Sequence, residues 1–580
     1  MSSTKFKLSV VTTALLSAFA AKATAQPMYS IVPVNLSADV QNSFTPNEVH
    51  GVAIRPATEV EMAELGPLGC FSQHDESLVN CEDGFQLAGE ARLRVDSVSL
   101  LDEAPFAMDA SFGYIEDYDS FKSYCYRELL YSTCESWAST YWNSWRNTVN
   151  GVENIKAFVQ GSAENTTSYI DYRITSIDES GEPIGMQSTT AAENVYTPRR
   201  NIISVPELPV DDLDSVIDHR AWAKLVASDG TVYVTGSTSK AKRNDNGDYY
   251  SSRATIWTAA DENSTFSAQQ LGWPSGKEQD GQRIAQASVR DIAELSDGSI
   301  YAVGYNTFDG SNNYFQASVF KRNEDGSFSQ GTEVSGATSK NNDGDVIYSN
   351  TQLVSINNNG IAIGESKLYG SRPENGAAAN KPFVVEDIAS ARSAKYLQNY
   401  GQSLFFTGVG ADLGAINNFN EIVGAIDATQ ARENDGQPRR RRGFIYTVPN
   451  LDTSMRADLF RNKAWLLDDL TNDGNQNSHN NKYRIIAASD INDAGVISAT
   501  AIYCSVGYDD TTHNSYCGNR QVQEQVVAVK LVPNPASLET EDGTPTINPR
   551  GVNDPPVERQ GAGFGWLFLA ALGFLGFRRK

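Results

Sequence analysis

Cysteine side chains offer the clearest chemistry in this sequence, because all six occur as three local pairs. The pairs are Cys70 and Cys81, Cys125 and Cys134, and Cys504 and Cys517, and none has the CxxC spacing of a redox or zinc motif. An even number of closely spaced cysteines favours disulfide bonds in an oxidising compartment. Six cysteines allow fifteen pairings, and among these we predict the local one, in which each of three disulfides closes a short loop.

Three clusters of Asn, Asp and Gly have the composition of calcium-binding loops, which supply several oxygen ligands. They span Asn244–Asp248, Asn341–Asp345 and Asn472–Asn477, and none is a full EF-hand loop closed by a glutamate. The same composition is typical of tight turns, and the five histidines are scattered along the chain. No cofactor or metal site is predicted, and calcium stays an alternative.

Catalytic signatures are missing from the sequence, which has no GxSxG elbow, HExxH helix, P-loop or dinucleotide fingerprint. Asp and Glu are abundant, so a carboxylate pair of the kind that cleaves glycosidic bonds would not stand out. The basic run Arg439–Arg442 is expected in a solvated loop, with an anion contact or a protease-sensitive site as alternatives. The sequence names no catalytic residue.

The charge of the chain restricts its partners. Its 580 residues include 71 acidic and 47 basic side chains, for a net charge of −24. Such a surface repels nucleic acid phosphates and anionic lipid headgroups, so nucleic acid is not expected as a partner. The length exceeds one ordinary compact domain, although a repeat architecture can extend a single structural unit this far.

The first 25 residues have the order of a secretory signal peptide. Lys5 and Lys7 precede the apolar stretch Leu8–Ala20, and Ala23 and Ala25 supply the small residues of a cleavage site. We expect residues 1–25 to be removed on export, with Gln26 as the first residue of the mature chain.

A short pattern recurs along the middle of the chain. Each copy has an apolar residue, an Asn/Asp-rich turn, and then alternating apolar residues that usually end in glycine. This order is typical of a β-hairpin, because Asn, Asp and Gly tolerate positive φ and the alternation gives one apolar face. The leading apolar residues are Ile177, Leu225, Ile292, Ile356, Ile416 and Ile491.

Each hairpin is followed by a further strand-like segment, such as Ala254–Ala259 or Gly443–Val448. A unit of about four strands cannot bury its own apolar face, so neighbouring units must stack. We predict a mainly β, β-propeller-like body over residues 26–533, with six or seven blades and with the strand Tyr29–Val34 beside the last one. Tandem β-sandwiches or a β-solenoid are the alternatives.

Residues 116–160 interrupt the β pattern. They contain no turn signal before Asn150, and their aromatic residues recur at intervals of three or four, which is helical spacing. We predict an inserted helical hairpin, held by Cys125 and Cys134, that caps one side of the β body. Its aromatic stripe is expected to be core, with a glycan or peptide groove as the alternative.

The last part of the chain differs in composition from the body. Asn534–Gln560 is rich in Pro, Gly and Asp and is predicted to be a flexible linker. Residues 561–580 contain an apolar stretch that ends at Arg578, Arg579 and Lys580, the pattern of a short membrane-spanning helix with a cytoplasmic basic end. The body is thus expected in the periplasm, on the cell surface or in the medium, with an inner-membrane anchor before processing.

The repeat pattern resembles the HAF-type repeat of bacterial extracellular proteins. The copies at Ile356–Gly364 and Ile416–Gly424 match best, and the copy that begins at Ile491 is a good match. The overall plan also resembles a family of secreted proteins of Gram-negative bacteria whose function is unknown. These resemblances imply a fold and a location but no chemistry.

The C-terminal end resembles the GlyGly-CTERM sorting tail, in which a small glycine-rich motif precedes a short apolar helix and a basic cluster. Gly561, Ala562 and Gly563 match the small motif, although Ala562 interrupts the glycine pair. The resemblance implies cleavage of the tail by a rhomboid-family sorting protease and export by the type II secretion machinery, after removal of the leader by signal peptidase.

The export signals, the repeats and the missing catalytic motifs together favour a non-enzymatic binding or structural module. A secreted hydrolase or lyase that acts on polysaccharide is the alternative, because propellers host such enzymes and fold alone does not decide function. The final ligand is not predicted.

Overall fold

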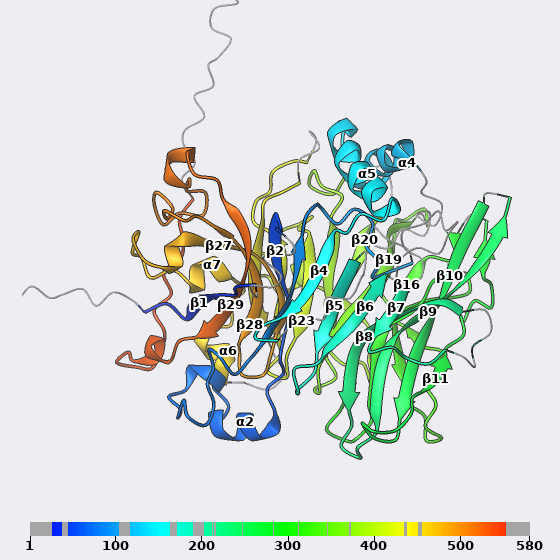
Figure 1. The fold of residues 1–580 in the computed structure, drawn as a ribbon, viewed down its shortest axis with the longest axis horizontal. Helices are drawn as coiled ribbons and strands as arrows, with labels where there is room; N and C mark the ends of the chain where they lie inside the picture. Colours follow the sequence, from blue (N-terminus) through cyan, green and yellow to red (C-terminus); the bar gives the residue numbers. More distant parts are fainter. Residues whose placement is uncertain are drawn as a thin grey trace, which may run out of the picture.

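The computed structural model describes residues 26–36, 45–103, 117–162, 171–188, 202–210, 213 and 216–552, apart from short gaps at 246, 282, 311, 345, 370–372, 434–437 and 450–454. Within these residues the chain is mainly β, with short helices beyond the ends of the strands (Figure 1). The prediction of a mainly β fold is confirmed.

Hydrogen bonding joins the described strands into six sheets, and the largest sheet combines the two ends of the chain. Its order is β27-β28-β29-β2-β3-β4-β5-β6-β7, and β1 also pairs with β29. These strands are β1 (Tyr29–Pro33), β2 (Glu48–Ile54), β3 (Leu87–Arg92), β4 (Ile155–Val159), β5 (Asp171–Ile177), β6 (Pro183–Ser188), β7 (Ile202–Val205), β27 (Tyr483–Ile491), β28 (Ile497–Tyr503) and β29 (Gln525–Pro533).

The other sheets follow one another along the chain. One contains β8 (Val216–Val226), β9 (Val232–Asn244), β10 (Gly247–Ala259) and β11 (Ser267–Gln270), and a small one pairs β12 (Gln279–Asp280) with β13 (Arg283–Ile284). The next contain β14 (Ser288–Glu294), β15 (Ile300–Thr307), β16 (Phe315–Lys321) and β17 (Thr332–Glu333), then β18 (Ser339–Lys340), β19 (Val346–Ile356), β20 (Ala362–Leu368), β21 (Asn380–Val385) and β22 (Ala394–Tyr396). The last contains β23 (Ala411–Ile416), β24 (Glu421–Asp427), β25 (Arg441–Thr447) and β26 (Trp465–Leu466).

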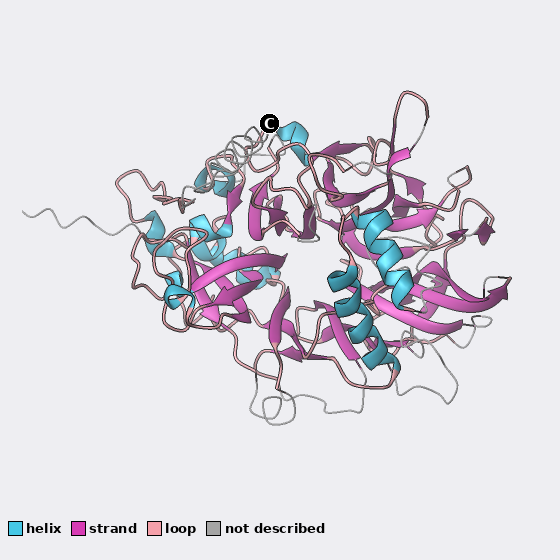
Figure 2. Cartoon of the chain, turned by 90° about the horizontal axis from the view of Figure 1, so that it is seen from above, coloured by secondary structure: helices cyan, strands magenta, loops and turns pink. Residues whose placement is uncertain are grey.

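Seven inner strands pack against one another in sequence. They are β2, β5, β8, β14, β19, β23 and β27; each contacts the next, and β27 contacts β2. Figure 2 shows the sheets arranged around a common centre. Hydrogen bonding alone does not close this arrangement, because β7 and β8 belong to separate sheets. Apolar side chains fill the space between neighbouring sheets, as where Ile363 and Val384 meet Ile422 and Phe444.

The repeated hairpins lie where the sequence predicts them. Their glycines have two structural roles, one in the turn and one in the second strand. Turn positions require positive φ, and Asn420, which stands in place of the turn glycine of its copy, adopts a φ of 62°. The closing glycines lie opposite bulges in the inner strands. A Cβ on Gly236 would overlap the carbonyl oxygen of Arg220, and one on Gly304 would overlap that of Ser288. Close backbone approach thus explains the closing glycine.

The predicted helical hairpin consists of α4 (Tyr118–Tyr124), the π-helical turn η3 (Cys125–Leu129) and α5 (Glu135–Val149), with the Cys125–Cys134 disulfide between them. Phe121 packs against Trp137, Trp142 and Trp145, so the aromatic stripe is core. The predicted range was too long at its end. Residues of β4 are mostly buried and join the large sheet instead.

The remaining helices are short. α2 (Glu59–Leu65) lies at one end of the strands, and α4 and α5 lie at the opposite end (Figure 1). Others are α6 (Met455–Leu459), α7 (Leu467–Leu470) and the 3-10 turns η1 (Gly69–Phe71), η4 (Leu397–Tyr400), η5 (Asn480–Lys482), η6 (Gly518–Arg520) and η7 (Pro535–Leu538). No helix among the described residues is both long enough and apolar enough to cross a membrane.

The described part of the predicted linker lies against the body. The backbone N–H of Arg550 donates to Asp469 (2.8 Å), and its guanidinium donates to the carbonyl of Asp468 (2.9 Å) and to Asn481 (3.0 Å). Arg550 is buried by these contacts, so residues 534–552 differ from the free linker that their composition suggests. The predicted sorting tail, with Gly561, Ala562 and Gly563, lies outside the described residues, as do Ala23 and Ala25.

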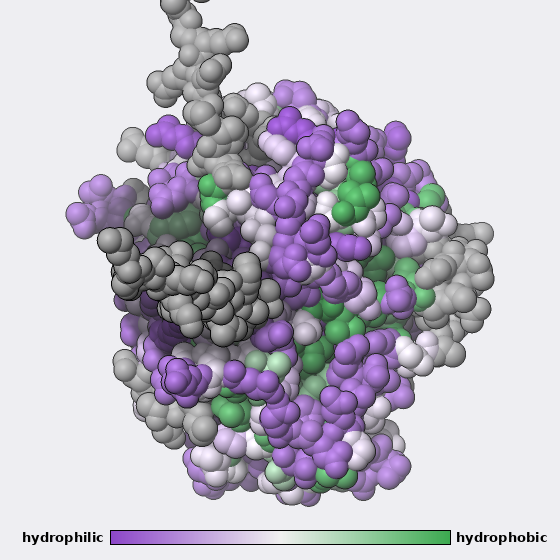
Figure 3. Space-filling view, turned by 90° about the vertical axis from the view of Figure 1, so that its left-hand side faces the viewer, coloured by the Kyte–Doolittle hydropathy of each residue, from purple (hydrophilic) through white to green (hydrophobic). Residues whose placement is uncertain are grey.

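Hydrophilic residues cover most of the visible face in Figure 3, which views the molecule from the side of β1 and β27. This surface is in keeping with the net charge of −24. Apolar burial is concentrated between the sheets, and such burial is the dominant favourable term in folding.

Candidate active site in the central cavity

A cavity of about 240 Å³ lies at the C-terminal ends of the inner strands. All seven inner strands contribute to its wall, together with the turns that follow several of them. The repeated sequence pattern therefore converges here: five of the leading apolar residues line the cavity, namely Ile177, Ile292, Ile356, Ile416 and Ile491. The sequence predicts these hairpins but does not place their ends around one cavity.

A chain of asparagines links the turns at the rim of the cavity. The Asn357 side-chain amide donates to the carbonyl of Asn417 (2.9 Å), and that of Asn417 donates to the carbonyl of Asn492 (3.1 Å). The Asn492 amide donates in turn to the carbonyl of Arg55, which follows β2 (2.9 Å). Their side-chain oxygens accept N–H groups of their own turns. The asparagine of the repeat thus both shapes a turn and binds it to the next.

Two aspartates lie in the cavity wall, and each connects its strand to the next inner strand. Asp291 on β14 accepts hydrogen bonds from the backbone N–H of Ile356 (2.9 Å) and from the hydroxyl of Ser355 (2.8 Å). Asp490 on β27 accepts from the backbone N–H of Ile54 (2.9 Å). Both carboxylates also accept the N–H of the residue that follows them, each at 2.8 Å.

The electrostatics of these aspartates depart from those of surface carboxylates. Burial raises the pKa of Asp291 to about 6 and that of Asp490 to about 6, and the charge of Asp291 further raises the pKa of Asp490. Both side chains nevertheless keep partial exposure, because they line the cavity. Raised pKa values of this kind are typical of carboxyl groups that act as acids or bases in active sites.

Lys224 supplies a positive charge to the same wall. Burial lowers its pKa, but the hydrogen bonds and charges of Asp178 (2.8 Å) and Glu262 (3.1 Å) outweigh this and raise the pKa of Lys224 above its usual value. Lys224, Asp291 and Asp490 all occupy the position before the leading apolar residue of a repeat. Other copies have Ser176, Ser355 or Ala415 there. The sequence did contain a signal for this site, because three copies have an ionisable residue at a position where the other copies have a small one. This signal was missed.

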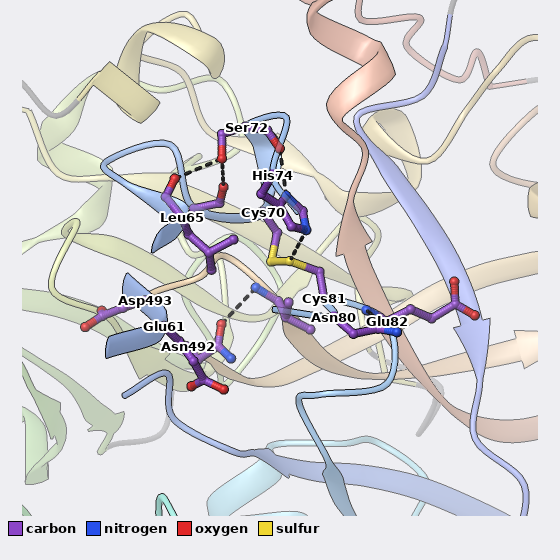
Figure 4. The surroundings of a disulfide bond; sticks show 12 residues. Glu61, Leu65, Cys70, Ser72, His74, Asn80, Cys81, Glu82, Asn492 and Asp493 are labelled. Carbon is purple, nitrogen blue, oxygen red and sulfur yellow. Dashed lines mark hydrogen bonds between the residues drawn. A yellow bond between two sulfur atoms is a disulfide. The ribbon is translucent and has the colours of Figure 1, made fainter. Parts of the chain in front are cut away.

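All three predicted disulfides are present: Cys70–Cys81, Cys125–Cys134 and Cys504–Cys517. Cys70 lies close to the cavity rim, since its N–H donates to the carbonyl of Ala494, two residues beyond Asn492 (2.9 Å). Figure 4 shows this disulfide beside Asn492 and Asp493, with the imidazole of His74 against the sulfur of Cys81 (3.4 Å). The disulfide therefore closes the loop after α2, and the N–H of Cys70 joins this loop to one turn of the rim.

The candidate calcium clusters are turns in the parts that the structure describes. Asn341 accepts the N–H of Asp343 (3.0 Å), and Asn472 accepts the N–H of Gly474 (3.1 Å). Among the described residues, no group of three His, Cys, Asp or Glu side chains is arranged to hold a metal ion. Calcium binding is not tested by this observation, because amide and carbonyl oxygens are also calcium ligands.

The basic run Arg439–Arg442 does not form a solvated loop. Arg439 pairs with Asp427 (3.2 Å), Arg441 with Asp412 (3.1 Å) and Asp427 (3.0 Å), and Arg442 with Asp468 (3.0 Å). The prediction was wrong because carboxylates from distant parts of the sequence are gathered around the start of β25. Arginine forks with several donors suit such buried pairing.

The fold and this cavity define a mainly β protein with ionisable residues at the centre of its repeats. Residues 231–580 match the family described as "Protein of unknown function (DUF3466)". The chain belongs to this family, in agreement with the resemblance to an uncharacterised family. No curated protein matches the chain in sequence.

Several solved structures match part of this chain at about 10% sequence identity. A levansucrase mutant from B. megaterium aligns with 58% of this chain and 86% of its own, with 10% identity and a TM-score of 0.28. The inulosucrase from Halalkalicoccus jeotgali bound to kestose covers 74% and 91%, with 10% identity and a TM-score of 0.26. An α-L-arabinanase mutant from Cellvibrio cellulosa covers 39% and 73%, with 10% identity and a TM-score of 0.23.

These comparisons correct one expectation from the sequence. A non-enzymatic binding or structural module was favoured there, whereas the solved structures named above are enzymes. At these TM-scores the matches assign no activity to this chain, and any activity has to be argued from its own residues.

Proposed function

We propose that this protein is an exported hydrolase or lyase that acts on polysaccharide, with Asp291 and Asp490 as its acid–base pair. The observation that carries the proposal is that the wall of one cavity contains two carboxyl groups, each with a raised pKa. Cleavage of a glycosidic bond by water needs one group to protonate the leaving oxygen and a second to activate the nucleophile or to attack. Because burial raises both pKa values to about 6, near that pH one carboxyl can be protonated while the other is ionised, and the two could then supply both groups.

We further propose that the sheets form the seven blades of a β-propeller around this cavity. The inner strands contact one another in chain order, β27 contacts β2, and the asparagine chain runs from Asn492 to Arg55. In a solenoid or a row of sandwiches the first and last units would not meet. A propeller would place a cavity on its axis, where residues from several blades converge.

Export is part of the proposal and is supported by the three disulfides. The leader at residues 1–25 and the tail at 561–580 would then be removed by signal peptidase and a rhomboid-family protease, with the body leaving through type II secretion. Mass spectrometry of the protein recovered from its native host tests this. A mature chain that begins at Gln26 and lacks Lys580 is expected, and a chain that retains both ends would overturn it.

The enzyme proposal is tested by incubating the mature protein with a panel of neutral and acidic polysaccharides and measuring reducing ends. We expect Asp291→Asn and Asp490→Asn each to lower kcat by about 10²–10⁴-fold, because either change removes one member of the pair. Asp297→Asn, in an exposed turn of the same repeat as Asp291, is the matched control and should keep full activity. An ultraviolet-absorbing unsaturated product would identify a lyase, and its absence a hydrolase.

A structural role of Asp291 must be separated from a catalytic one. Ser355→Ala removes a hydrogen bond to Asp291 but leaves its carboxyl group in place, so we expect activity to be retained with a small loss of thermal stability. The proposal fails if folded Asp291→Asn and Asp490→Asn proteins, checked by circular dichroism, degrade a substrate at the wild-type rate. It also fails if no polysaccharide in the panel is degraded.

A further inference from the structure

A second group of polar side chains lies on the inner strands β8 and β14, away from the cavity-facing carboxylates. The guanidinium of Arg290 lies 3.6 Å from the ring centroid of Trp222 and 5.2 Å from that of Tyr305. Arg220 occupies the same strand as Trp222, and its side chain is fully buried. Arg290 directly precedes Asp291, so this cluster and the cavity share strand β14.

Several donors of this cluster have no acceptor. Within the part of the chain that the structure describes, the buried Nη2 of Arg220, Nε1 of Trp222, and Nε and Nη1 of Arg290 have no hydrogen-bond partner. A buried donor without an acceptor costs about 1–3 kcal/mol. Native proteins rarely leave several together unless the site serves a ligand or holds water.

An acidic segment of the chain already occupies other donors of the same arginines. Glu103 pairs with Arg220 (2.9 Å), whose Nε also donates to the carbonyl of Leu100 (2.7 Å). Asp102 pairs with Arg290 and also accepts the hydroxyl of Tyr305 (3.2 Å). Two carboxylates of this segment thus pair with the two guanidinium groups, and Arg220 also donates to the hydroxyl of Ser239 (3.0 Å).

We propose that Arg220, Trp222 and Arg290 form a subsite for an oxyanion group of an acidic sugar, and that the segment Leu100–Glu103 competes for it. A sugar hydroxyl is both donor and acceptor, whereas a carboxylate or sulfate presents only acceptors. A carboxylate or sulfate therefore suits a cluster of donors that have no acceptor. Arginine forks bind planar carboxylates with two parallel hydrogen bonds, which adds specificity.

If this subsite and the cavity bind the same polymer, the substrate is an acidic polysaccharide. This part of the inference rests on the proposed function. An acidic polysaccharide would place a charged sugar unit beside β14 while a neighbouring glycosidic bond reaches Asp291. Binding of the anionic group does not need the chemistry. The Asp291→Asn protein should therefore bind as the wild type does, even though it is inactive.

Binding is measured by isothermal titration of the mature protein with oligogalacturonate, a sulfated galactan oligomer, and neutral oligomers of the same length. We expect at least one anionic oligomer to bind and the neutral ones not to bind. The carboxylated and sulfated arms distinguish the two sources of the oxyanion. Arg290→Gln and Arg220→Gln should each weaken binding by about tenfold or more, whereas Arg127→Gln, on the exposed surface of η3, should leave it unchanged.

Loss of the competing carboxylate should have the opposite effect. Asp102→Asn removes the negative charge beside Arg290 and is expected to tighten anion binding, a gain that general destabilisation would not produce. Arg290→Lys keeps the charge without the fork and should weaken binding if Arg290→Gln fails to fold. Equal binding of neutral and anionic oligomers, or no response of affinity to Arg290→Lys and Asp102→Asn, would overturn the subsite. Binding without polysaccharide cleavage would leave the subsite standing and reject the enzyme proposal alone.

Discussion

Single side chains hold the turns of this protein together across long distances in sequence. Asn357, Asn417 and Asn492 each bind the main chain of the next turn, and Asp291 and Asp490 do the same for the inner strands. Sequence patterns identify the asparagines as turn residues, because that role depends on their near neighbours. The contacts between repeats depend on which turns come to lie side by side, and one copy of the pattern contains no such information.

The aspartates of the candidate site were hidden for a related reason. In the sequence, Asp291 and Asp490 look like the many other acidic residues near the turns. Their raised pKa values depend on burial, and only the assembled repeats create that burial. The three disulfides were easier to predict, because each joins two cysteines that are close in sequence. The arginine cluster of β8 and β14 could not be predicted from the sequence, because its residues come from different repeats. The acidic segment that they contact, Leu100–Glu103, precedes α4 and is distant from both strands in sequence.

Glu365 gives a prediction at the scale of one residue. This side chain on β20 is buried and accepts the N–H of Leu413 (2.6 Å), and burial together with the charge of Asp412 raises the pKa of Glu365 to about 8. Between about pH 4 and 8 the unfolded chain releases a proton that the folded chain keeps, so its contribution to stability falls as pH rises through this window. Glu365→Gln cannot ionise and should raise Tm at pH 8 but not at pH 4.

Thermal unfolding at both pH values checks this prediction. Glu64→Gln, exposed on α2, is the control and should not change the pH dependence. An equal Tm difference at pH 4 and pH 8 for Glu365→Gln would show that folding does not raise the pKa of Glu365.

At the scale of the element, the unit of this fold is a hairpin whose first strand bulges toward a glycine on the second. The alternating pattern and the turn residues predict the hairpins, and the spacing of aromatic residues predicts α4 and α5. The pattern does not predict that β29 joins β2, or that β4 joins β5, into one large sheet. Those links are single parallel pairs, Glu48 with Val526 and Ile155 with Asp171, and they depend on how whole units pack.

The bulge predicts a penalty for adding one methyl group. In Gly236→Ala the new Cβ meets the carbonyl oxygen of Arg220, which is main chain and cannot rotate away. We expect a loss of about 1–3 kcal/mol in the free energy of unfolding, measured by urea denaturation. Gly551→Ala is the control, since its Cβ would have only Thr512 at 4.0 Å. Equal stability of the two variants would mean that β8 can flatten its bulge at no cost.

At the scale of the whole molecule, the first and last strands belong to one unit. β1 pairs with β29 over its full length, from Tyr29 opposite Pro533 to Pro33 opposite Val529. The apolar residues of β1 face the same core as those of β27 and β28. The sequence suggests this pairing through the early strand Tyr29–Val34, but only the arrangement of all the repeats brings its partner within reach.

The two faces of β1 predict different costs for the same substitution. Ile31 is buried in the core, so Ile31→Asp should lower the free energy of unfolding by about 3 kcal/mol or more. Ser30 points to the other face and is partly exposed, so Ser30→Asp should cost much less. Urea denaturation of both proteins makes the comparison, and equal losses would contradict the pairing of β1 in this register.

The partnership of β1 and β29 also sets an order of events during synthesis. The ribosome makes β1 among the first structured residues and β29 among the last, so β1 has no partner until nearly the whole body has been translated. A chain that stops before Gln525 leaves the edge of β28 unpaired as well, and exposed strand edges attract aggregation partners and proteases. Pairing of the two strands therefore acts as a check of completeness, because only a chain translated through Pro533 can hide both edges.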